Sequence, residues 1–154
     1  MAVFKTSQGR SVAHFHIGDP DYYDSDLNAD GIAQARAIVA DFASAVEIDA
    51  PTRRFNCHAF AYAVSHGWFN QAKPFIDDDV TQVPFADARR GDIVSYRKNG
   101  RLKHSGVVEH VTNGVITKVM SKWGALATVI HDLEDVHPAF GKPEIIRRPN
   151  GEII

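Results

Sequence analysis

Residues 104–121 decide the fold, and they read HSGVVEHVTNGVITKVMS. Apolar and polar residues alternate on both sides of Asn113-Gly114, which is the pattern of half-buried β-strands. Asn-Gly is a preferred pair for a two-residue turn between antiparallel strands, because both positions need a positive φ angle. The stretch therefore predicts a β-hairpin, with one strand over 104–111 and its partner over 115–121.

The sequence on either side of the hairpin extends the sheet. Apolar runs rich in β-branched and aromatic residues predict three more strands, at 93–96, 126–130 and 144–147. Turn residues such as Asn99-Gly100 separate them. The second half of the chain is therefore expected to form an antiparallel sheet.

The first half has the other periodicity. Apolar residues recur at helical spacing over about 30–46 and again over about 56–67, so two helices are predicted there. Helices followed by an antiparallel sheet predict an α+β fold. At 154 residues the chain is expected to be one domain, with a helical part over about 19–67 and a β part over about 91–148.

The Asn-Gly turn also predicts the register of the hairpin. If these two residues form the loop, the numbers of paired residues sum to 227. Gly106 then lies opposite Ser121, and His104 lies opposite Trp123. Residues that face each other share one side of the sheet, so Ser121 is predicted on the same face as His104.

Composition limits the class of protein. The formal net charge is −2, with 44% hydrophobic and 23% charged residues, as in an ordinary globular domain. The negative net charge argues against nucleic-acid binding, and although short basic pairs exist, the sequence has no long basic stripe. No apolar stretch is long enough to span a bilayer, and the N-terminus lacks the apolar run of a signal peptide. We expect synthesis in the cytoplasm, with any export following a signal-independent route.

Cys57 is the only cysteine, so no internal disulfide can form. It follows Asn56 at a predicted helix start, where unpaired backbone N–H groups and the helix dipole favour the reactive thiolate. A histidine could then hold the proton and deliver it to a leaving group. Asn56 and nearby N–H groups could stabilise an oxyanion. The alternative is a small buried core residue, the commoner role of a lone cysteine.

Several short motifs follow one another in an informative order: Asn56-Cys57 before a helix, Gly-Asp-Ile-Val at 91–94, His-Ser-Gly-Val-Val at 104–108, and the Asn-Gly hairpin. In this order they resemble the NlpC-like and CHAP amidase superfamily of papain-like cysteine peptidases. The resemblance covers residues 55–124. The Ser-Lys-Trp-Gly stretch at 121–124 and the later Phe-Gly pair also resemble a branch of that superfamily with an Asn-Cys-x-Ala helix.

The resemblance implies a papain-like core and a cysteine-dependent amide hydrolase. Carried over by motif, it makes Cys57 the nucleophile that forms an acyl-enzyme and His104 the base, with no cofactor or metal. Peptidoglycan peptides are the implied substrate class. Without a signal peptide, that implies an injected effector, a phage-associated lysin or a recycling enzyme; an effector would have an immunity or inhibitor protein as partner. Acyl transfer or glutamine deamidation would use the same two residues.

The third catalytic position departs from the family pattern. The family usually places His, Asn, Gln or Glu on the strand after the histidine, where it accepts the imidazole N–H. The register predicts Ser121 for this position, although serine orients an imidazole weakly. Trp123 is predicted either to line a substrate cleft or to lie in the core.

Two further readings follow from this departure. The second hypothesis is a catalytically silent binding module on the same scaffold, in which the thiol is buried and unreactive. The third hypothesis makes Cys57 a plain core residue of a generic α+β binding protein.

Other candidate positions are predicted to be structural. His131 and His137 lie among acidic residues without a standard zinc spacing, so both are expected to be salt-bridged surface histidines. Residues 77–79, three consecutive aspartates, are expected to form a solvated loop.

Residues 26–31, DLNADG, match the opening of a calcium-binding loop. The twelfth position of that loop is Ala37, where the motif needs a glutamate that supplies two of the ligands. We therefore expect a polar turn in which Asn28 or Asp30 caps the first helix.

Overall fold

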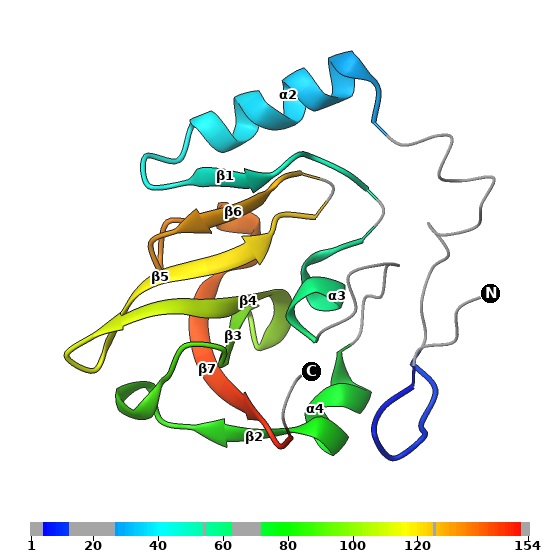
Figure 1. Cartoon of the computed structure of the whole chain (residues 1–154), viewed down its shortest axis with the longest axis vertical. Coiled ribbons are helices and arrows are strands. Elements are labelled where there is room, and N and C mark those ends of the chain that lie inside the picture. The colour runs from blue at the N-terminus through cyan, green and yellow to red at the C-terminus, as the bar shows by residue number, and fades with distance from the viewer. Residues whose placement is uncertain (1–4, 13–26, 54, 63–71, 125, 152–154) are drawn as a thin grey trace.

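The computed structural model describes residues 5–12, 27–53, 55–62, 72–124 and 126–151, and Figure 1 shows a sheet with short helices around it. Within this part of the chain the strands are β1 (Val46–Asp49), β2 (Val80–Val83), β3 (Ile93–Lys98), β4 (Arg101–Thr112), β5 (Val115–Lys122), β6 (Thr128–His131) and β7 (Lys142–Pro149). The helices are α2 (Ala29–Ala40), α3 (Cys57–Ala61) and α4 (Lys73–Asp79), with 3₁₀ turns η1 (Phe85–Asp87) and η2 (Pro138–Phe140).

All strand pairs of the described sheet are antiparallel, in the order β1-β6-β5-β4-β3-β7-β2. The α+β class is confirmed, and so are the five strands predicted from the alternation of the second half. No helix in the described ranges is long and apolar enough to cross a membrane.

The predicted hairpin between β4 and β5 is confirmed together with its register. Asn113 and Gly114 have φ angles of 51° and 76°, as a two-residue turn of this kind requires. Thr112 pairs with Val115, and Val107 pairs with Met120. An irregularity at His110 is local, because the predicted pairing resumes at Val108.

The predicted division into a helical part and a β part is wrong at two places. The first helix ends at Ala40, and Val46 belongs to strand β1, where it pairs with Ile130. Strand β2 lies before residue 91 and pairs with β7. Both strands are short edge strands whose partners are distant in sequence, so local periodicity gives no sign of them.

Residues 77–79 are also different from the expectation, because they form the last turn of α4 instead of a loop. The predicted end of the second helix at Gly67 lies outside the described residues. The predicted cap of the first helix is confirmed: Asn28 Oδ1 accepts a hydrogen bond from the backbone N–H of Gly31 at 2.9 Å.

Both faces of the sheet are covered. One face carries Val94 and Val108, which share a core cluster with Val39 of α2. The opposite face carries Ile93 and its neighbours, which pack with the α3 residues Ala59 and Ala61. Because successive side chains of a strand point to opposite faces, neighbouring residues of β3 and β4 belong to different clusters.

Candidate active site

Cys57 begins helix α3, as the sequence predicts. Asn56 is the N-cap, and its Oδ1 accepts a hydrogen bond from the backbone N–H of Ala59 at 3.1 Å. The thiol is buried, with 6% of the residue exposed. Asn56 thus uses its side-chain oxygen to begin the helix, and its predicted oxyanion role stays a prediction.

The surroundings of the thiol disfavour its ionised form. Burial raises the pKa of Cys57 to about 11, although the backbone groups of Ser105 and His58 and the positive charge of Lys122 act in the opposite direction. The five residues of α3 add only a short helix dipole. At neutral pH the sulfur is therefore almost entirely a thiol, which is the unreactive form.

Lys122, the cation near this thiol, is itself completely buried. Its ammonium donates hydrogen bonds to the backbone oxygens of Thr52 and Gly124 and lies 5.0 Å from the centre of the Phe55 ring. These contacts satisfy a buried charge, and they hold the end of β5 against the segment that leads into α3.

His58 is the histidine next to Cys57 in sequence, and it contacts the sheet. Its Nδ1 lies 2.8 Å from the Ser105 hydroxyl, and the ring is buried. Burial lowers the pKa of His58 to about 4. The imidazole is therefore neutral at physiological pH and serves as a contact between α3 and β4.

His104, the predicted base, is completely buried in a stack of aromatic rings. Its ring lies parallel to that of Phe140, with centroids 4.0 Å apart and planes at 7°, and 5.2 Å from the ring of Tyr96. Neither ring nitrogen has a hydrogen-bond partner among the described residues. Burial, and then the charges of His131 and His58, hold the pKa of His104 well below its ordinary value.

Cys57 and His104 lie against opposite faces of the sheet. His104 and Ser105 are consecutive in β4, so their side chains leave the strand in opposite directions. The Ser105 hydroxyl meets His58 of α3, whereas the His104 ring meets Phe140 of η2. The structure therefore does not bring the two predicted catalytic residues together.

Ser121, the predicted third residue, is bonded elsewhere. Its hydroxyl lies 2.7 Å from His131 Nε2, and the indole N–H of Trp123 donates to it at 3.1 Å. The predicted placement on the same face as His104 is consistent with a Cβ built at Gly106, which would lie 3.3 Å from the Ser121 Cβ. The expected hydrogen bond between Ser121 and His104 is absent from the described residues, because the partner of Ser121 is His131.

His131 was missed as a core residue by the sequence reasoning, and the expectation of a surface salt bridge is wrong. It is fully buried on β6, and its Nδ1 lies 2.7 Å from the backbone oxygen of Asp132. A signal was available in the alternation of Thr128, Val129, Ile130 and His131, which places the histidine on the same face as Val129. His137 instead caps η2 by accepting a hydrogen bond from Ala139 at 3.1 Å.

Trp123 is a core residue, one of the two roles that the sequence left open. It is 1% exposed and packs edge-on against Phe42 at 4.8 Å between ring centroids. In the described part of the chain, no group of three or more histidine, cysteine or acidic side chains is arranged to hold a metal ion.

Comparison of this chain with known protein families, with curated proteins and with solved structures finds no match.

Proposed function

We propose that this chain is a catalytically silent binding module, in which the cysteine and the buried histidines serve the core. The observation that carries this proposal is the placement of Cys57 and His104 against opposite faces of the sheet. A cysteine nucleophile needs a base within hydrogen-bond reach, about 2.6–3.2 Å, and a lowered pKa. Here the pKa of the thiol is raised to about 11.

The surroundings of His104 support the same proposal. A general base must exchange protons with its partner and with water, which requires an accessible ring nitrogen. His104 is completely buried, and its parallel stacking on Phe140 is the contact of an aromatic core residue. We therefore expect an aromatic hydrocarbon side chain to replace His104 without loss of the fold.

The second candidate is a cysteine-dependent amide hydrolase with a papain-like core. The observation that favours it is the pair of groups near the sulfur, the Ser105 backbone and the Lys122 charge, which both favour the thiolate. In this proposal Cys57 attacks an amide carbonyl, such as that of a peptidoglycan peptide, and forms an acyl-enzyme. His104 takes the thiol proton and gives it to the leaving amine, and it then activates a water molecule that hydrolyses the acyl-enzyme.

This second candidate makes further demands on the same residues. Ser121 would orient His104, Asn56 would help to bind the oxyanion, and Trp123 would line the substrate cleft. His104 would have to leave Phe140 and reach the face of the sheet that α3 covers, and Ser121 would have to leave His131. Those two rearrangements make the hydrolase the less favoured of the two candidates.

The test is the pH dependence of Cys57 alkylation by iodoacetamide, measured on the folded protein. The single thiol makes the signal specific. We expect slow alkylation below pH 9, with a rate that still rises toward pH 11. His104→Phe should stay folded and leave this profile unchanged, because no hydrogen bond is lost and the ring stack is kept. His110→Gln, at an exposed histidine, is the matched control.

The opposite result is equally clear. Fast alkylation at pH 6–7 that slows at least tenfold in His104→Phe, while His110→Gln behaves as the wild type, would contradict the binding module. It would establish an activated Cys-His pair and make the hydrolase the working assignment.

A further inference from the structure

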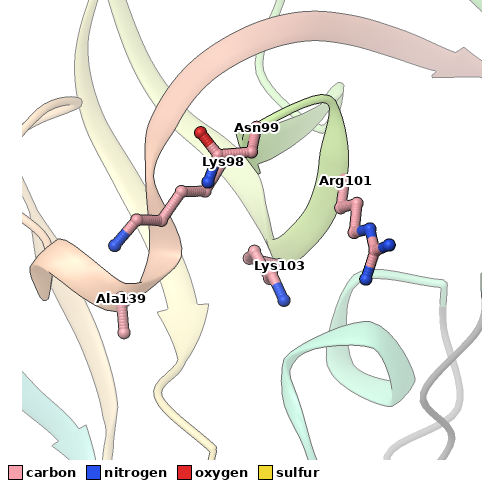
Figure 2. Close-up of a pocket in the computed structure, with 5 residues that line it drawn as sticks. All are labelled: Lys98, Asn99, Arg101, Lys103 and Ala139. Atoms are coloured by element: carbon pink, nitrogen blue, oxygen red, sulfur yellow. The ribbon is translucent and has the colours of Figure 1, made fainter.

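A cavity of about 570 Å³ lies beside the turn between β3 and β4, on the surface of the molecule. Figure 2 shows the side chains that line it: Lys98, Asn99, Arg101, Lys103 and Ala139. Its volume is within the usual range of small-molecule sites, about 300–1,000 Å³. None of these residues belongs to the site around Cys57.

The lining of this cavity is cationic. Lys98, Arg101 and Lys103 are exposed, and no acidic side chain is found among the described residues that line the cavity. Among the described residues, none of the three forms an ion pair. Arg97 is different, because it pairs with Glu144 at 3.4 Å and donates to the Gly100 oxygen at 2.7 Å. The whole chain has a net charge of −2, so this concentration of positive charge is local.

The backbone fixes this arrangement of charges. Asn99 and Gly100 form the turn with φ angles of 53° and 75°, and Lys98 pairs directly with Arg101 across it. Like charges directly opposite each other on antiparallel strands destabilise the pair. A bound anion would remove that repulsion, whereas an empty cavity keeps it.

A second cavity, of about 410 Å³, shares Lys98 and Asn99 with the first. It adds the exposed Lys142 and also Glu144, whose charge is paired with Arg97. Positive charge is thus available on both sides of the turn. Among the described residues that line the larger cavity, only Ala139 has an apolar side chain, so these residues offer little surface to an apolar ligand.

We propose that the cavity formed by Lys98, Asn99, Arg101 and Lys103 binds a small molecule that carries two or more phosphate groups. The guanidinium of Arg101 matches the geometry of a phosphate, and two ammonium groups neutralise further charge. The Asn99 amide can donate to a phosphate oxygen. Three cations that line one cavity suit a compact, multiply charged anion better than the extended backbone of a nucleic acid.

This inference names a ligand class for the binding module proposed above and depends on that proposal for its biological meaning. The binding itself is independent of the chemistry of Cys57. If Cys57 proved to be activated, the cavity could still bind a phosphate ligand. If pyrophosphate did not bind, the pKa of the Cys57 thiol would be unaffected.

The test is isothermal titration calorimetry of the full chain with inorganic pyrophosphate, at pH 7 and low salt. The decisive variant is Arg101→Gln/Lys103→Gln. Its matched control is Lys5→Gln/Arg89→Gln, which removes one lysine and one arginine, both exposed, from outside the cavity. We expect the control to bind within twofold of the wild type and the cavity variant to bind at least tenfold more weakly.

Three further ligands, adenosine diphosphate, citrate and duplex DNA, test which kind of anion the cavity binds. Adenosine diphosphate that binds more tightly than pyrophosphate would show that the natural ligand has an organic part, and equal affinity would point to the phosphates alone. Citrate should bind more weakly than pyrophosphate. The proposal is overturned if pyrophosphate does not bind, if both double variants bind alike, or if duplex DNA binds more tightly than pyrophosphate.

Discussion

Ser121, His131 and Trp123 form a hydrogen-bonded chain inside the core. The Asp132 backbone oxygen can only accept, so His131 Nδ1 donates to it, and Nε2 of the neutral ring accepts from the Ser121 hydroxyl. The same hydroxyl accepts from Trp123 Nε1. Every member is completely or almost completely buried, so each depends on the others for its hydrogen bonds.

Ser121→Ala should therefore destabilise the protein. It leaves His131 Nε2 and the Trp123 indole N–H buried without a partner, and an unsatisfied buried group costs about 1–3 kcal/mol. The free energy of unfolding from urea denaturation measures this loss. Thr117→Ala is the control, because it removes a hydroxyl bonded to the exposed His110 at 2.8 Å and should change stability by less than about 0.5 kcal/mol. Equal effects of the two variants would contradict the role of Ser121.

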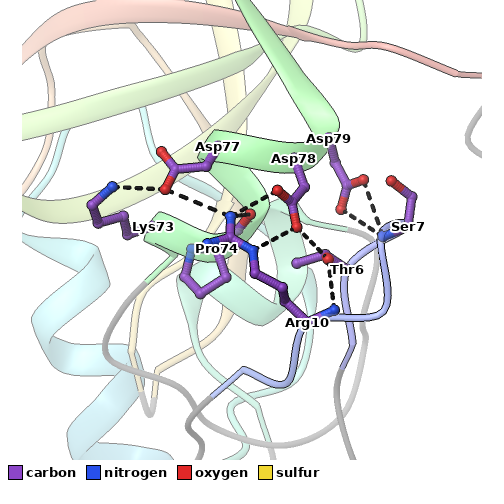
Figure 3. Close-up of polar contacts among 8 residues, drawn as sticks. All are labelled: Thr6, Ser7, Arg10, Lys73, Pro74, Asp77, Asp78 and Asp79. Atoms are coloured by element: carbon purple, nitrogen blue, oxygen red, sulfur yellow. Dashed lines mark hydrogen bonds and ion pairs between the residues drawn. The ribbon is translucent and has the colours of Figure 1, made fainter.

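At the scale of elements, helix α4 holds the N-terminal turn of residues 6–10. Figure 3 shows Arg10 against Asp78, with Nε–Oδ2 and Nη2–Oδ1 distances of 2.9 and 2.7 Å. The Thr6 hydroxyl also donates to Asp78, and the Ser7 backbone N–H donates to Asp79 at 3.1 Å. The aspartates expected in a solvated loop thus form the side of α4 to which this turn is attached.

Asp78→Asn should loosen this turn while leaving the sheet intact. The amide keeps one acceptor but loses the charge that holds the Arg10 guanidinium. We expect amide hydrogen exchange to accelerate several-fold at residues 6–10. Asp87→Asn, which removes an equal charge from an exposed position, should leave that exchange unchanged. Faster exchange throughout the sheet in Asp78→Asn would contradict a local role.

At the scale of the whole molecule, three histidines of the described residues, His58, His104 and His131, are buried in the core, and burial lowers the pKa of each. In the unfolded chain each returns to an ordinary value near 6.5. Below pH 6.5 the unfolded state therefore binds more protons than the folded state. The corresponding stability is complete above pH 6.5 and is lost as the pH falls toward the folded pKa values.

Stability should consequently fall steeply between pH 6.5 and pH 4. For His58, whose folded pKa is about 4, the loss over this range is roughly 3 kcal/mol. Urea midpoints at pH 8, 6, 5 and 4 measure it. His58→Gln should flatten the profile by removing one titrating group, and His110→Gln at an exposed position should not.

The carboxylates with lowered pKa values, Asp77, Asp78 and Asp135, lose their contribution to stability only below about pH 4. A flat profile between pH 8 and pH 5 would refute this account.

The features predicted correctly from the sequence are local ones. The Asn-Gly turn, the register of β4 and β5, the cap at Asn28 and the helix start at Cys57 each depend on a few neighbouring residues. The strands β1 and β2 were missed because their partners, β6 and β7, lie more than 60 residues away in the sequence. Four residues with a distant partner carry too little periodicity to be recognised.

The candidate site shows the same limit for a different reason. The alternation of β4 determines that His104 and Ser105 point in opposite directions, but it does not say which face receives α3. In an open sheet with one wet face, polarity would answer that question. Here four consecutive residues of β3, Ile93 to Tyr96, are all buried, so both faces are covered and the alternation along the strand is compatible with either choice.

The sequence by itself thus determined the α+β class, the hairpin with its register, and the position of Cys57 at the start of a helix, because each follows from spacing along the chain. Only the tertiary structure decided that α3 packs on the face of Ser105, that His104 stacks on Phe140, and that His131 takes Ser121 as its partner. These outcomes depend on how helices and 3₁₀ turns pack over a sheet with two buried faces. Such packing depends on contacts between residues that are distant in sequence, and residue spacing does not encode it.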